Sequence, residues 1–73
     1  MEVKIGIQSV PRELIMETAS SYQEVEQAVR AAVTDGTVFV LQDEKGGRVI
    51  VPAEKLAYVE LGGTEPRRIG FGS

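Results

Sequence analysis

The feature that most limits how this chain can fold is its short length combined with the absence of cysteine and histidine. It has 73 residues and contains neither residue type. No disulfide or thiolate metal site is therefore possible, and the commonest nitrogen ligand of zinc is missing. A domain of this size buries only about 60% of the surface exposed by its unfolded chain. The sequence predicts one domain with a small apolar core, whose stability would gain from a partner subunit.

Charge and hydropathy limit the cellular compartment and the classes of partner that we expect. Eight basic and eleven acidic side chains give a net charge of −3, which argues against broad electrostatic binding to nucleic-acid phosphates. The first residues lack the basic and apolar regions of a secretory signal, and no apolar run approaches the roughly 20 residues of a membrane span. We expect a cytoplasmic protein with no membrane partner, and we expect nucleic acid to be an unlikely partner.

The chain begins with a strand pattern. Apolar and polar residues alternate over residues 2–8, as in a strand with one buried face. Pro11 breaks this run, and alternation resumes over residues 12–18, where Leu14 and Met16 share a face. A hairpin is therefore expected.

A helix pattern follows. Ser21 with Glu24 three residues later is typical of a capping box, and Gly36 suits the end of a helix. A helix is thus expected over residues 22–34. Its apolar stripe has helical spacing and consists of Tyr22, Val25, Val29, Ala32 and Val33.

The second half returns to strands. Residues 37–42 are nearly continuously apolar, residues 43–47 have hairpin-turn composition, and residues 48–51 form the next strand. A single helical turn is expected over residues 52–55 and a fifth strand over residues 56–61. The expected order is ββαβββ. The fold class is α+β, with a single helix packed on a mainly antiparallel five-stranded sheet.

One domain is expected over residues 1–66, followed by a flexible C-terminal tail over residues 67–73.

Catalytic machinery is not evident. The carboxylates lie at expected solvent-facing positions, so no pair of acids is held in contrasting environments. Without histidine or cysteine, only a lysine could activate a serine, and none lies in a recognisable motif. The glycine pairs lack the spacing of a phosphate-binding loop, and the acidic turn lacks that of a calcium loop. We expect no enzyme activity, no cofactor and no metal.

One sheet face emerges as a candidate interaction surface. Alternation assigns to the helix-covered face Val3, Ile5, Ile7, Leu14, Met16, Val38, Val40, Val49, Val51 and Val59. It leaves on the opposite face the apolar residues Ile15, Phe39, Leu41, Ile50 and Tyr58. A shift of one residue would exchange the faces, and Phe39 and Leu41 would then be core residues.

Three arrangements would cover such an apolar surface. It is either a homodimer interface, a docking site for a partner protein, or a second small core closed by Ile69 and Phe71 of the tail. The first two rank above the third, because a small core gains from added burial.

The sequence resembles a small actinobacterial protein family catalogued as a domain of unknown function. The resemblance rests on residues 1–8, 11–14, 43–46, 48–60 and 68–72. Some members carry an automatically assigned ATP-binding label, although these residues contain no nucleotide-binding motif. The resemblance supplies no catalytic motif that transfers to this chain.

Two functions remain as hypotheses. The first is a non-enzymatic module that binds an unidentified protein or itself through the helix-free sheet face or an open strand edge. The alternative is a nucleotide-binding or single-stranded nucleic-acid-binding domain that uses Lys45, Arg48, Arg67 and Arg68. In either case Arg67, Arg68 and Phe71 are candidate contacts from the tail.

Overall fold

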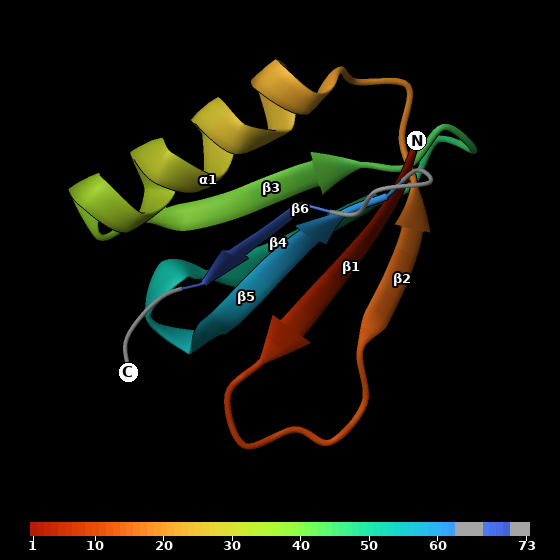
Figure 1. Ribbon diagram of the computed structural model, residues 1–73. Helices are drawn as coiled ribbons and strands as arrows, with labels where there is room; N and C mark the ends of the chain where they lie inside the picture. The colour runs from red at the N-terminus through yellow and green to blue at the C-terminus, as the bar shows by residue number, and fades with distance from the viewer. Residues whose placement is uncertain (63–66, 71–73) are drawn as a thin grey trace.

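The structure is a computed structural model that describes residues 1–62 and 67–70. Its elements are shown in Figure 1. They are β1 (Glu2–Ile7), β2 (Leu14–Glu17), α1 (Tyr22–Asp35), β3 (Val38–Gln42), β4 (Arg48–Pro52), the 3-10 turn η1 (Ala53–Lys55), β5 (Leu56–Leu61) and β6 (Arg67–Gly70). Within these described ranges, no helix is long and apolar enough to cross a membrane.

Both ends of α1 are fixed by their local sequence. The Ser21 hydroxyl accepts from the Glu24 backbone N–H at 3.2 Å, and the Glu24 carboxylate accepts from the Ser21 N–H at 2.8 Å. Gly36 then enters the left-handed region at φ 66°, and its N–H donates to the Ala32 carbonyl. The expected capping box and glycine end are confirmed, and the helix extends one residue further, to Asp35.

Replacing Ser21 with alanine should remove one hydrogen bond from the start of α1. We expect Ser21→Ala to lower the free energy of unfolding by about 1 kcal/mol, measured by urea denaturation. Ser20→Ala is the matched control, because Ser20 uses its backbone N–H to contact Thr18 and is not the capping residue. Equal losses for the two variants would contradict the assigned role of Ser21.

Four strands form one antiparallel sheet in the order β2-β1-β5-β6. Directly paired residues lie on the same face of a sheet. Val3 lies opposite Met16 on one side and Leu61 on the other, and all three are buried. This face of the four-stranded sheet is therefore the core face.

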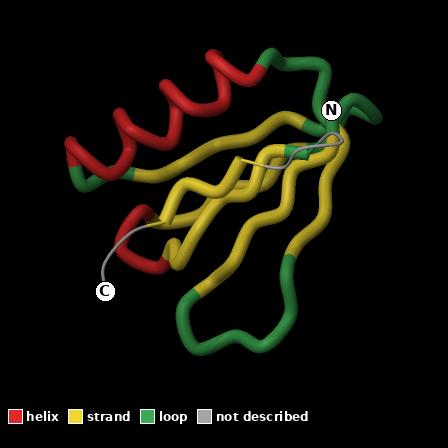
Figure 2. The backbone as a smooth tube through the Cα atoms, viewed as in Figure 1, coloured by secondary structure: helices red, strands yellow, loops and turns green. Residues whose placement is uncertain are grey.

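The remaining strands, β3 and β4, form a separate two-stranded hairpin. At its turn, the Asp43 carboxylate accepts from the Lys45 N–H at 2.7 Å, and Gly46 adopts φ 103°. The Glu44 N–H donates to the Glu17 carbonyl at 3.0 Å, which ties the turn to the end of β2. Figure 2 shows the hairpin strands with the helix α1 along β3.

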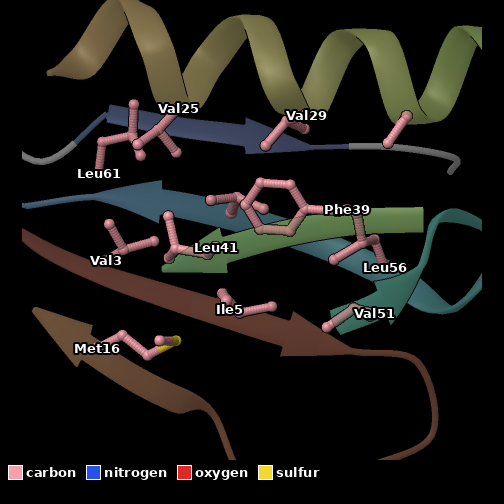
Figure 3. Close-up of a cluster of buried hydrophobic side chains, with 12 residues drawn as sticks. Val3, Ile5, Met16, Val25, Val29, Phe39, Leu41, Val51, Leu56 and Leu61 are labelled. Atoms are coloured by element: carbon pink, nitrogen blue, oxygen red, sulfur yellow. The ribbon is translucent and has the colours of Figure 1, made fainter. Parts of the chain in front are cut away.

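The core lies between the four-stranded sheet and a second layer made by α1 and the hairpin. Figure 3 shows the side chains of Val25 and Val29 pointing from α1 towards those of the strands, with the Phe39 ring among them. Phe39 and Val29 have no exposed surface. The buried cluster consists of Val3, Ile5, Met16, Val25, Val29, Ala32, Phe39, Leu41, Val51, Leu56, Val59 and Leu61.

The α+β class and the order ββαβββ are confirmed, but the strand arrangement differs from the expected single sheet. The hairpin leaves the plane of the other strands and packs with α1 over their core face. Arg67–Gly70, expected to belong to a flexible tail, forms the sixth strand and pairs with β5. Ile69 pairs with the buried Val59 and packs against the main core, so it does not close a second one. Phe71 lies outside the described residues.

Candidate functional site

The outward face of the β3–β4 hairpin carries an exposed apolar surface. Phe39 and Leu41 are buried, so the alternate residues Val38 and Val40 point away from the core. Val40 pairs with Ile50, and Val38 pairs with Pro52. The exposed fractions are 48% for Val38, 41% for Val40 and 62% for Ile50, and Pro52 is also exposed. We call these four residues the hairpin patch.

An open hollow of about 490 Å³ adjoins one end of the hairpin patch. It lies where the end of α1, the start of β3 and η1 meet. Its lining consists of Val33, Gly36, Thr37, Val38, Pro52, Ala53 and Glu54. Val33 belongs to the helix and is 38% exposed, so apolar surface continues from the hairpin patch towards α1.

The two ends of the hairpin differ in polarity. At the turn end, Gln42 pairs with Arg48, and both are exposed on the same face as the hairpin patch. At the other end, Pro52 leads into η1, where Glu54 is exposed at the rim of the hollow. The surface is therefore an apolar strip between a cation and a carboxylate.

The outer face of the four-stranded sheet is different in character. Tyr58 pairs with Gly6, and its ring lies where a Cβ atom on Gly6 would be, while its hydroxyl donates to the Glu13 carboxylate. Lys4 lies between Ile15 and Glu60 across neighbouring strands. Charged and half-buried side chains dominate this face, and Ile15 is the large apolar side chain most exposed on it, at 62%.

The five residues of the expected interaction surface separate into three locations. Ile50 lies in the hairpin patch, and Ile15 and Tyr58 lie on the outer face of the other sheet. Phe39 and Leu41 lie in the core, so their expected exposure is wrong. The same correction applies to Val38 and Val40, which were expected beneath the helix.

The physical reason is that the hairpin packs as a separate layer with its own orientation. Residues 37–42 are apolar at nearly every position, so alternation alone does not choose between their faces. One signal in the sequence does favour the observed choice. Gln42 and Arg48 are polar and share a face with Val38 and Val40, which marks that face as the outer one.

The four cations of the alternative hypothesis are divided between the β3–β4 hairpin and β6. Lys45 lies in the β3–β4 turn and Arg48 at the start of β4, and both are exposed. The backbones of Arg67 and Arg68 belong to β6, at the opposite edge of the sheet from β2, to which the turn is tied. Three strand spacings separate β2 from β6, or about 14 Å. This arrangement does not gather the four residues at the hairpin.

Within the described residues, no group of three or more acidic, cysteine or histidine side chains could hold a metal ion. What the hairpin patch offers is apolar contact area, with Arg48 on its own face at the turn end and Glu54 beside the hollow at the other end.

Comparison with known proteins shows the family. A search of curated proteins finds no match. A family model described as a protein of unknown function, DUF3107, matches residues 1–72. Because that match covers nearly the whole sequence, the chain belongs to the DUF3107 family.

Proposed function

We propose that the chain is a non-enzymatic cytoplasmic module that binds protein through the hairpin patch. The observation that carries this proposal is the exposure of Val38, Val40 and Ile50 together on one face of a two-stranded hairpin. Contiguous apolar surface of this kind on a soluble domain marks an interaction site more often than isolated exposed residues do. The absence of cysteine fits an intracellular domain that does not depend on disulfides.

The small core supports the same proposal. The core of a domain of this length rarely supplies more than roughly 3–5 kcal/mol of stability. Binding of any partner to the native state alone adds to that stability. Coverage of the hairpin patch would also remove exposed Ile50 from water while leaving the buried cluster on the other side of β3 unchanged.

Site-specific photo-crosslinking in cells that produce the protein tests this proposal. We expect a photoreactive amino acid at position 40 or 50 to give covalent adducts with protein, either another protein or a second copy. Position 15 is the matched control, because Ile15 is exposed to the same 62% as Ile50 but lies on the other sheet. Equal labelling from positions 15 and 50, or none from positions 40 and 50, would reject the hairpin patch as the binding surface.

A further inference from the structure

The hairpin patch has complementary ends. Arg48 marks the turn end of its face, and Glu54 marks the end at η1. The pair Val40–Ile50 lies midway between them, because it is the central pair of the five that join β3 and β4. A twofold axis that runs across the strands, above this central pair and parallel to the hairpin face, exchanges the two ends and places a second copy face to face with the first.

A second copy placed by that rotation matches the surface in both charge and shape. Ile50 faces Ile50 of the second copy, and Arg48 faces Pro52 of the second copy with Glu54 beside it. The hollow of about 490 Å³ at that end provides space for the long Arg48 side chain. Stacking with the strands parallel would instead bring the two Arg48 ends together, and like charges there oppose association.

We propose that the occupant of the hairpin patch is a second copy of this chain, stacked face to face with its hairpin strands antiparallel. This inference rests on the proposed binding function and specifies its partner. Each copy contributes its apolar strip and receives the Arg48 side chain of the other beside Glu54. The contact is isologous, as in most symmetric homodimers.

The small size of the surface limits the contacts that this dimer can make. The four residues of the hairpin patch and the lining of the adjoining hollow are fewer than the roughly 20–30 residues that each partner contributes to a standard interface. The dimer is therefore weak and concentration-dependent, and exchanges rapidly with the monomer.

The outer face of the four-stranded sheet does not offer the same match. Ile15 lies between Glu13, before β2, and Glu17, at its end. If two copies stacked face to face with their β2 strands antiparallel and centred on Ile15, Glu13 of each copy would face Glu17 of the other. Like charges would then meet at both ends of the contact. The charge pattern therefore favours the hairpin patch over the Ile15 surface for self-association.

Sedimentation of the full chain from about 1 μM to about 1 mM tests the proposal, because a weak dimer populates across this range. We expect a reversible monomer–dimer equilibrium. Ile50→Lys should raise the dissociation constant by at least about tenfold, since it places two ammonium groups at the centre of the apolar contact. Ile15→Lys should leave it unchanged. Loss of the dimer in Ile15→Lys but not in Ile50→Lys would overturn the assignment.

A charge exchange tests the antiparallel arrangement. Arg48→Glu and Glu54→Arg should each weaken the dimer by about fivefold or more, because each places like charges together at both ends. The double variant restores opposite charges and should return to within about twofold of the original affinity. Failure of the double variant to recover, while both single variants weaken the dimer, would rule out this arrangement.

The outcomes separate this inference from the proposed function. A chain that stays monomeric to the highest concentration overturns self-association. If the same chain still forms adducts with another protein from position 40 or 50 in cells, the binding function stands with a different partner.

Discussion

Phe39→Ala should abolish or nearly abolish cooperative folding. Phe39 has no exposed surface and lies within the cluster that joins α1 to both sheets (Figure 3). Removing a buried phenylalanine side chain costs about 3–5 kcal/mol, because the transfer free energy is lost and a cavity remains. That loss is as large as the roughly 3–5 kcal/mol of stability that a core of this size rarely exceeds. Circular dichroism during urea denaturation should show a transition that begins without denaturant.

Two further variants make the result quantitative. Phe39→Leu keeps most of the apolar volume and should remain folded, with a loss of roughly 1–2 kcal/mol. Val40→Ala alters the adjacent residue on the exposed face and should cost less than about 1 kcal/mol. A larger loss for Val40→Ala than for Phe39→Leu would mean that the two faces of β3 are assigned the wrong way round.

The sequence predicted which segments form strands and the helix better than it predicted which face of β3 packs against α1. The alternation around Val3 and Ile5, the Ser21–Glu24 capping box and Gly36 are local signals, and the structure confirms each. Residues 37–42 lack such a signal, because they are apolar at nearly every position. Their orientation depends on how the hairpin packs against α1. The local sequence pattern carries no information on that packing.

The C-terminal strand shows a second limit. Arg67–Gly70 contains two arginines and a glycine, a composition that favours a solvated tail. Its pairing with β5 supplies backbone hydrogen bonds, and Ile69 contributes to the core through its position opposite Val59. A single apolar residue in a short segment is too weak a signal to predict that pairing.

The candidate site was predicted only in part for the same reason. Ile50 was correctly placed on an exposed face, but its neighbours there are Val38 and Val40 instead of Phe39 and Leu41. A shift of one residue in the predicted inward–outward alternation of β3 therefore exchanged the site residues with the core residues. The site depends on side-chain direction in one strand, so a correct list of elements was not enough to define it.

Gly6→Ala should clearly destabilise the domain, because the added methyl group has no room on the outer face of the four-stranded sheet. A Cβ atom at Gly6 would overlap the ring of Tyr58, which pairs with Gly6 from β5. The ring would have to move, and its hydrogen bond to Glu13 would be disturbed. We expect a loss of about 1–3 kcal/mol in the free energy of unfolding, the usual cost of overpacking.

Gly70→Ala is a closely matched control for that loss. Gly70 pairs with the same Tyr58 from the opposite side, in β6, but a Cβ atom there would meet nothing within 4 Å. Its cost should stay within about 0.5 kcal/mol. Tyr58→Ala removes the obstructing ring, so adding Gly6→Ala to that variant should cost at least about 1 kcal/mol less than adding it to the original chain. Additive losses would show that Gly6 is required for a reason other than the ring above it.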